Sequence, residues 1–268
     1  MDSEQTNIRD LDDPRLAPFR DLRSRKLPRS SGVFIAEGPF LVHALLNSRF
    51  ESLGVLVDQR HAERFAHELP PGTKMLVAET ELLQQVVGFN FHRGILACGR
   101  REQERQFSSA DLLASQQRVV PALVGIEDPE NLGTILRTCA GLGMSQVIIG
   151  EGCCDPFSRR ALRVSMGATL SLDLHISSDI HQSLEDLTKL QGIEIIATTL
   201  GPDAESLQEC RVSPPTVVML GNENAGLPQE LLDLATRKVS IKMHADIDSL
   251  NVAVAAGIIL HYFDRLGS

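Results

Sequence analysis

Two polar loops near the end of the chain each follow a short apolar run and precede a segment that favours a helix. The apolar run at 216–220 stops at the loop 221–226, whose sequence is GNENAG. The run at 239–241 stops at a second polar loop, which closes at 249–251 with the sequence SLN. In open α/β sheets, ligands bind beyond the carboxyl ends of the strands. These two loops are therefore the first candidates for a binding site.

The loop 221–226 offers backbone groups and one carboxylate. Its sequence is neither GxGxxG nor a phosphate-binding P-loop, so it supports no known nucleotide motif. Gly221 directly follows the apolar run, and a glycine in that place lets a ligand approach the backbone closely. Glu223 adds an acid, although an isolated loop of this kind is more often an ordinary turn with a solvated carboxylate. The loop alone therefore predicts no activity.

The second loop opens an apolar helix that extends to Phe263. Ser249 can be a plain N-cap, whereas Asn251 stands where an apolar or acidic residue would be favoured. The helix is apolar on nearly every face, so we expect it to be buried all round. Such a helix fits the middle of a domain or a subunit interface, and a homodimer is the simpler explanation.

A third motif lies upstream, where Asn131, Gly133 and Arg137 follow each other as NxGxxxR. Asn131 and Gly133 fall at a predicted helix start, where free N–H groups gather. Arg137 lies among apolar residues and needs an anion or a carboxylate to face, for which Glu223 and a substrate phosphate are candidates. An exposed arginine on the outer face of the helix is equally compatible with this motif.

The elements that position these residues form two α/β series. Strands and helices alternate from 32 to 98, and a second alternation runs from 119 to the closing helix. The polar stretch 99–117 reads as a linker. We therefore predict an α/β fold with two domains, at 1–105 and 106–268, in which residues 1–14 are frayed and 15–27 form a basic helix.

Composition limits the class of protein. The chain has 268 residues, of which 43% are hydrophobic, and it contains no apolar run of membrane-spanning length. Its polar N-terminus does not resemble a signal peptide. Five cysteines without a CxxC motif predict reduced thiols and no metal site. These features predict a cytoplasmic protein without a membrane partner.

The net charge of −9 argues mildly against a nucleic-acid partner, but the charge is unevenly distributed. Residues 1–105 carry 15 basic and 15 acidic residues, so the whole excess of acid lies in 106–268. The neutral half also contains a dense basic stretch, made of Arg15, Arg20, Arg23, Arg25, Lys26 and Arg29. Such a stretch can hold phosphates or can be a solvated helix face, and charge alone does not decide between them.

Taken together, the three motifs resemble those of the SpoU/TrmH ribose methyltransferases, in the same order. The resemblance rests on NLGTILR at 131–137, on LGNENAGLP at 220–228 and on DSLNVAVAAGIIL at 248–260. The segment DPFSRRALRVSMGA also resembles one that the family carries between its first two motifs. The N-terminal half is similar to the ribosomal-protein-like substrate-binding domain that is fused to many members.

The resemblance implies a knotted (trefoil) SPOUT methyltransferase domain at 106–268 and an RNA substrate-binding domain at 1–105. It implies S-adenosylmethionine as the cofactor, held in the knot by the backbone at Gly221, Ile241 and Leu250, with Thr198 nearby. The product would be a 2′-O-methylated ribose in RNA, with ribosomal RNA favoured over tRNA and no role for DNA. A homodimer would complete the site.

The resemblance also assigns catalytic roles. Arg137 would stabilise the forming alkoxide and clamp the neighbouring phosphate, while Asn131 and Glu223 would orient Arg137. Ser249 and Asn251 would hold the ribose and the cofactor loop.

The chain departs from the family pattern at four positions. Lys242 stands where proline is usual and Ala245 where glycine is usual, and both could alter cofactor affinity. Asn222 and Ala225 are milder changes in the second motif.

Three alternatives remain at this stage. The first is a tRNA ribose methyltransferase. The second is a non-catalytic RNA-binding assembly factor that kept the fold, which predicts no turnover. The third is a nucleotide-dependent metabolic α/β enzyme, which predicts no salt-dependent affinity for RNA.

Overall fold

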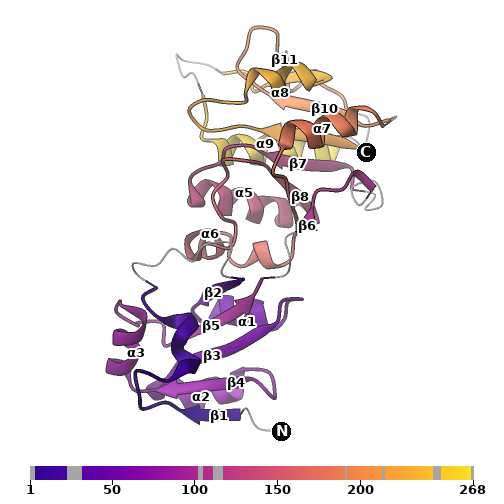
Figure 1. Ribbon diagram of the computed structural model, residues 1–268. Coiled ribbons are helices and arrows are strands. Elements are labelled where there is room, and N and C mark those ends of the chain that lie inside the picture. Colours follow the sequence, from indigo (N-terminus) through magenta and orange to yellow (C-terminus); the bar gives the residue numbers. More distant parts are fainter. Residues whose placement is uncertain are drawn as a thin grey trace. The chain divides into compact units, whose positions relative to one another are not determined.

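The structure is a computed structural model. It describes residues 4–22, 32–101, 105–110, 117–190, 192–212, 215–243 and 249–266. The chain forms two compact units (Figure 1). Unit 1 comprises Met1–Gln103 with Asp155–Leu170, and unit 2 comprises Glu104–Cys154 with Ser171–Ser268. Of the predicted basic helix at 15–27, residues 23–27 lie outside the described residues, and Pro14–Phe19 form the 3₁₀ helix η1.

Unit 1 is built on a five-stranded mixed sheet in the order β1-β4-β3-β5-β2. The strands are β1 (Glu4–Asn7), β2 (Val33–Glu37), β3 (Ser52–Asp58), β4 (Lys74–Ala78) and β5 (Ile95–Arg100). The helices are α1 (Pro39–Leu46), α2 (Ala62–Glu68) and α3 (Thr80–Val87), with η3 (Gln59–His61) before α2. Strand β5 pairs antiparallel with both β2 and β3, whereas β3 and β1 pair parallel with β4.

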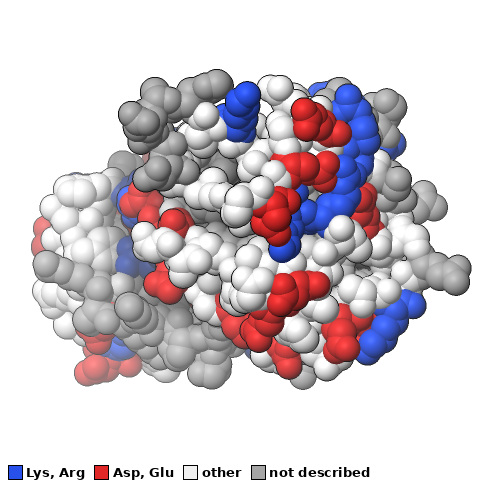
Figure 2. Space-filling model, turned by 90° about the horizontal axis from the view of Figure 1, so that it is seen from above, with Lys and Arg blue, Asp and Glu red and all other residues white. Residues whose placement is uncertain are grey.

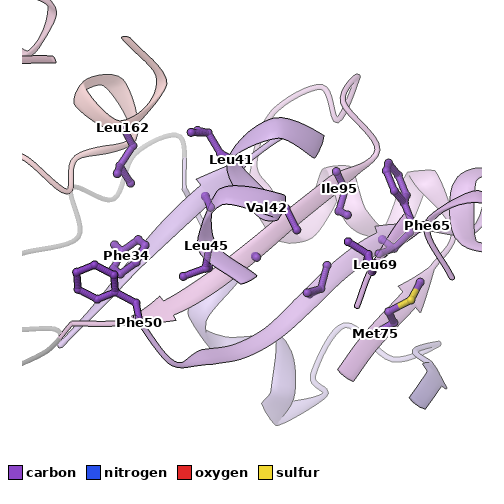
Figure 3. Packing of buried hydrophobic residues seen from close by; sticks show 14 of the residues in the cluster. Phe34, Leu41, Val42, Leu45, Phe50, Phe65, Leu69, Met75, Ile95 and Leu162 are labelled. Carbon is purple, nitrogen blue, oxygen red and sulfur yellow. The ribbon is translucent and has the colours of Figure 1, made fainter. Parts of the chain in front are cut away.

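Both faces of this sheet are covered. Alternate residues of β3 enter different cores, so that Val55 and Val57 pack with α1 and α2, while Leu56 packs with α3 and η1. Figure 3 shows the first of these cores, in which Phe34 and Phe50 lie edge-on at a centroid distance of 5.5 Å. The predicted strands here are nearly continuous apolar runs because neither face is exposed to water.

A segment from the second half of the sequence belongs to unit 1. It contains α6 (Arg159–Val164) and the 3₁₀ helix η4 (Ala168–Leu170), and Leu162 enters the core drawn in Figure 3. Phe157 packs against Phe34 at a centroid distance of 5.1 Å. From chain order this helix was expected in the second α/β series, because chain order alone does not reveal where an excursion packs.

Unit 2 is built on an eight-stranded parallel sheet in the order β11-β13-β10-β12-β7-β8-β9-β6. In chain order the strands are β6 (Arg105–Gln106), β7 (Val119–Leu123), β8 (Gln146–Ile149), β9 (Asp173–Ile176), β10 (Glu194–Thr198), β11 (Glu205–Ser206), β12 (Thr216–Leu220) and β13 (Arg237–Ser240). The helices are α5 (Pro129–Gly141), α7 (Ile180–Thr188), α8 (Gln229–Leu234) and α9 (Val252–Leu266).

The helices of unit 2 cover the sheet in two groups. Apolar residues of α7 and α8, such as Leu184 and Leu231, share a core with alternate residues of β7, β10 and β12. Helix α9 contacts α5, β7 and β12. Within the single chain, Val254 and Ile258 of α9 are exposed, so the prediction that this helix is buried all round is wrong for one chain.

Four short strands of the structure were not predicted from the sequence. Glu4–Asn7 were expected to be frayed but form β1 in parallel register with β4, and Ile8 after them is buried. Arg105–Gln106 were expected to be linker but pair with β9. Strands β9 and β11 were not predicted either, although Leu172, Leu174 and Ile176 alternate along β9 as in a strand; β11 has only two residues. The helix expected after the loop 221–226 is α8. Within the described residues, no helix is long and apolar enough to cross a bilayer.

No disulfide bond joins the cysteines within the described residues. Burial raises the pKa of the Cys98 thiol to about 11 and that of Cys139 to about 12, so both stay protonated at neutral pH. No group of three histidine, cysteine, aspartate or glutamate side chains among the described residues is arranged to hold a metal ion.

Candidate active site

A pocket of about 410 Å³ opens at the carboxyl ends of three adjacent strands of unit 2, β13, β10 and β12. This volume lies within the range of about 300–1,000 Å³ that is usual for small-molecule sites. The pocket is lined by all four residues predicted to bind the cofactor, which are Thr198, Gly221, Ile241 and Leu250. Glu223 and Ser249 line it as well. Residues far apart in the sequence meet here because parallel strands end at the same edge of the sheet.

The loop 221–226 is closed by its own backbone. The amide of Asn222 donates to the carbonyl of Gly226 at 3.1 Å, and the amide of Gly226 donates back at 2.9 Å. A Cβ atom on Gly221 would lie 2.6 Å from the carbonyl carbon of Gly226. The glycine at 221 is therefore required by the returning backbone of the loop itself, in addition to any close approach of a ligand.

Asn222 fixes this loop to the segment that follows β7. Its side-chain oxygen accepts hydrogen bonds from the amides of Asn224 and Ala225, both at 2.9 Å, and its Nδ2 donates to the carbonyl of Gly125 at 2.7 Å. In the sequence Asn222 stood out only as a mild departure from the family pattern. An asparagine side chain often accepts from the backbone amide two residues later, so an asparagine within a polar loop is the signal that could have identified this role.

Three predicted site residues form a hydrogen-bonded chain across the pocket's edge. The Nδ2 of Asn131 donates to Oε1 of Glu223 at 2.6 Å, and the Nδ2 of Asn251 donates to Oδ1 of Asn131 at 2.9 Å. Asn131 lies in the first turn of α5, whose N-cap is Asp128. The side-chain amide of Asn131 thus links the second and third motifs. Glu223 lies 92 residues after Asn131 in the sequence, and Asn251 lies 120 residues after it.

Asn251 also begins α9. Its Oδ1 accepts hydrogen bonds from the amides of Ala253 at 2.9 Å and Val254 at 3.3 Å, the arrangement of an N-cap. The alternative that Ser249 caps this helix is therefore wrong. Ser249 is exposed and lines the pocket, where its hydroxyl can reach a ligand. Lys242 is exposed as well, and Ala245 lies outside the described residues.

Arg137 is the one predicted catalytic residue that stands apart. It lies six residues after Asn131 on α5, about 9 Å along the helix axis and on another face. It is exposed, and among the described residues it has no hydrogen-bond or ion-pair partner. Within the single chain it therefore makes no ion pair with Glu223, and its orientation by Asn131 and Glu223 stays a prediction.

A segment absent from the sequence-based site forms one wall of the pocket. Thr199, Leu200 and Gly201 follow β10 and line it, and Leu200 is exposed. The segment is fastened by ion pairs beyond it, from Lys238 to Asp203 at 2.6 Å and from Arg237 to Glu205 at 2.6 Å.

On the face shown in Figure 2, basic and acidic side chains alternate and do not gather into one basic patch.

The chain matches known proteins over nearly its full length. The model of the SpoU rRNA Methylase family matches residues 118–261. A protein of Mycobacterium bovis named as a tRNA/rRNA methyltransferase is 38% identical over 97% of this chain and 92% of its own. The 23S rRNA (guanosine(2553)-2′-O)-methyltransferase RlmP of Bacillus subtilis is 25% identical over 92% of this chain and 95% of its own.

A solved structure shares the fold. The AdoMet-bound rRNA methyltransferase from Sinorhizobium meliloti superposes with a TM-score of 0.77 at 25% identity, covering 96% of this chain and 97% of that one. The α/β architecture, the three motifs and the family match agree, and this chain belongs to the SpoU rRNA methylase family.

Proposed function

We propose that this protein transfers a methyl group from S-adenosylmethionine to a ribose 2′-hydroxyl in structured RNA, with ribosomal RNA as the substrate class. The observation that carries the proposal is the pocket at the ends of β13, β10 and β12, with the Glu223–Asn131–Asn251 chain at its edge. Ribosomal RNA is favoured over tRNA because the full-length relatives with named substrates, RlmP and the Sinorhizobium protein, act on rRNA.

The pocket fits S-adenosylmethionine in size and in chemistry. Backbone segments at 198–201, 220–227 and 239–241 surround it, and apolar side chains such as Leu227 and Ile259 lie beside polar loop groups. The hydroxyl of Thr198 donates to the carbonyl of Met219 at 2.8 Å and so holds the ends of β10 and β12 together. When bound, the cofactor supplies an electrophilic methyl group on a sulfonium.

A trefoil knot around this pocket is part of the proposal. Strand β13 lies between β10 and β11, although both precede it in the sequence. The amide of Leu207 donates to the carbonyl of Ser240 at 2.8 Å, and the hydroxyl of Tyr262 donates to the carbonyl of Gln208 at 2.9 Å. The segment after β10 is thus hydrogen-bonded to β13 and α9, which both come later in the sequence. A knot requires an arrangement of this kind.

The protein side of the reaction is mainly positioning and charge stabilisation. Asn131 fixes the carboxylate of Glu223 and the start of α9, so the loops that flank the pocket keep one arrangement. The guanidinium of Arg137 is exposed and can meet a substrate phosphate and the developing charge on the ribose oxygen. The proton leaves the 2′-hydroxyl to that phosphate or to water, because arginine is too weak an acid to lose its own.

Dimerisation supplies a reason for the exposed position of Arg137. The outward face of α9 presents Val254, Ile258 and His261, and α9 packs beside α5, which carries Arg137. An apolar stripe of this kind suits a two-fold contact with a second copy. In such a dimer, Arg137 of one subunit can act at the pocket of the other.

Co-expression of two inactive variants tests the function and the shared site together. Arg137→Ala and Glu223→Gln should each fail to transfer tritium from labelled S-adenosylmethionine to ribosomal RNA of cells that lack the gene. If the site is shared, a mixed dimer contains one complete site and regains activity. Activity of the wild type without recovery in mixed dimers would place Arg137 and Glu223 in the same subunit's site.

Absence of transfer by the wild type despite bound cofactor would instead support the non-catalytic assembly factor. Transfer to tRNA but not to ribosomal RNA would overturn the preferred substrate class while leaving the chemistry in place. Mapping of the 2′-O-methylated nucleotide in the product then identifies the target ribose.

A further inference from the structure

Three arginines in unit 1 surround one carboxylate, at the end of β2. Oε2 of Glu37 lies 2.6 Å from Nη2 of Arg159 and 4.0 Å from Nη1 of Arg163, and Oε1 lies 3.8 Å from Nε of Arg93. The Glu37 side chain is only 11% exposed. One negative charge faces three positive charges, so the cluster keeps a local excess of two positive charges.

The three arginines are not equivalent. Arg159 is fixed in place, because it also donates to the carbonyl of Leu22 at 2.7 Å and stacks over the ring of Phe89 at 4.6 Å. Arg93 and Arg163 approach Glu37 only at 3.8 and 4.0 Å, and their side chains are 49% and 35% exposed. Arg159 therefore neutralises Glu37, while Arg93 and Arg163 keep donors available for an anion from solvent.

Two exposed apolar side chains lie beside these arginines. Phe40 is 57% exposed in the first turn of α1, three residues after Glu37. A Cβ on Gly167 would lie 3.9 Å from Cε1 of Phe40, which places the end of α6 against the ring. Met166, immediately before Gly167, is 43% exposed. An exposed ring and a partly exposed thioether chain thus lie three residues after Glu37 and Arg163 respectively, on the segments that carry this cluster.

Met166 holds this position at a cost in backbone energy. The amide of Gly167 donates to the carbonyl of Leu162 at 3.1 Å and that of Met166 donates to Arg163 at 3.2 Å, the pattern of a Schellman C-cap. Met166 occupies the left-handed place of that cap, with φ +51°, where glycine is usual. Met166 is 43% exposed, so burial of the side chain alone does not account for this conformation.

We propose that Arg93, Arg163, Phe40 and Met166 form an RNA-binding site on unit 1, in which the arginines bind backbone phosphates and Phe40 stacks on an unpaired base. Single-stranded RNA offers a partner for both kinds of side chain, because aromatic rings stack on any base and guanidinium groups bind phosphate oxygens. The inference rests on the proposed function, since it takes RNA as the substrate class. It assigns part of substrate recognition to residues of unit 1 outside the methyl-transfer pocket.

The test is fluorescence anisotropy of a labelled single-stranded RNA oligonucleotide with the full-length protein, repeated over a series of KCl concentrations. Arg93→Gln combined with Arg163→Gln should weaken binding and reduce the slope of log affinity against log salt by about 1.4, since each lost phosphate contact on a single strand removes about 0.7. Phe40→Ala should weaken binding about tenfold with little change in slope. Arg159 is left intact in these variants because its other contacts hold the fold.

Two further variants separate binding from folding. Lys74→Gln is the matched control, because Lys74 is exposed on β4, which is separated from β2 by β3 and β5, and its removal should leave affinity unchanged. Met166→Gly relieves the left-handed strain, so we expect it to weaken RNA binding without lowering the melting temperature. Unchanged RNA affinity in the double arginine variant and in Phe40→Ala would overturn the proposal.

The outcomes distinguish this proposal from the proposed function. If the wild type methylates ribosomal RNA while the variants bind RNA as the wild type does, only the site on unit 1 is wrong. If the wild type binds the oligonucleotide at this site but transfers no methyl group, only the proposed activity is wrong. Competition by poly-glutamate as strong as that by RNA would indicate an acidic protein partner and would overturn the assignment to RNA.

Discussion

Glu223 in unit 2 and Glu37 in unit 1 are partly or largely buried carboxylates near strand ends, but their surroundings are opposite. Glu223 accepts one hydrogen bond from a neutral amide, at 2.6 Å, and no ion pair reaches it from the described residues. Glu37 has three guanidinium groups within 4.0 Å. A carboxylate oriented by an amide keeps its negative charge for a ligand or a catalytic arginine. A carboxylate surrounded by arginines leaves a net positive surface, which suits an anion.

The largest effect should follow from removing the charge of Glu223. Glu223→Gln preserves the size of the side chain and can still accept the amide of Asn131, so we expect stability within about 0.5 kcal/mol of the wild type. Methyl transfer should fall by about 100-fold or more, because the site loses a charge that orients the reacting groups. Initial rates with labelled cofactor and a melting curve measure both quantities. Glu209→Gln, an exposed change in the same unit, should alter neither.

A second variant tests whether the position of Glu223 depends on the closure of the loop 221–226. In Gly221→Ala the new methyl group would lie 2.6 Å from the carbonyl carbon of Gly226, so the loop must open. We expect a loss of about 1–3 kcal/mol in stability and at least tenfold weaker binding of S-adenosylmethionine by calorimetry. Gly141→Ala is the matched control, because no atom lies within 4 Å of its Cβ position in α5. Equal cofactor affinity in both variants would show that the closed loop is dispensable.

For Glu37 we expect the opposite pattern, in which loss of the charge lowers stability but does not reduce ligand binding. Glu37→Gln leaves three guanidinium groups without a countercharge, and because these side chains are partly solvated we expect a loss of about 1–2 kcal/mol. RNA affinity should hold or rise, since the local excess of positive charge increases by one. Glu51→Gln, which breaks a pair exposed on both sides with Arg100, should change the melting temperature little. A fall in RNA affinity would mean that Glu37 chiefly arranges the arginines.

The sequence predicted the two polar clusters unequally, for physical reasons. The pocket could be predicted from the sequence because each of its loops follows an apolar strand, and the carboxyl ends of parallel strands share an edge. The hydrogen-bonded chain through Asn131 could not be predicted, since a motif does not state which side chain its amide will face. The Glu37 cluster was also missed, because Arg159 and Arg163 reach unit 1 only through the excursion 155–170. An interaction between distant segments has no local pattern.

Glu205 completes the series as a carboxylate that shares one arginine, Arg237, with Glu194. The guanidinium of Arg237 contacts both of its oxygens, at 2.6 and 2.7 Å, and hydrogen bonding to Arg237 lowers the pKa of Glu205. Because the folded pKa lies below the unfolded one, the pair stabilises the protein above the unfolded pKa, near 4.3, and this contribution disappears as pH falls through the folded pKa.

The smallest effect among these carboxylates should therefore come from Glu205→Gln, and it should depend on pH. Both side chains are about 30% exposed, so we expect a loss of about 0.5–1 kcal/mol at neutral pH. The difference in melting temperature from the wild type should shrink when both proteins are melted at a pH well below 4. A difference that persists at low pH would mean that Glu205 acts through packing rather than charge. RNA binding should be unaffected, because Glu205 is not part of the arginine cluster of unit 1. Methyl transfer should change little, because the ion pair of Lys238 with Asp203 still fastens the same wall of the pocket.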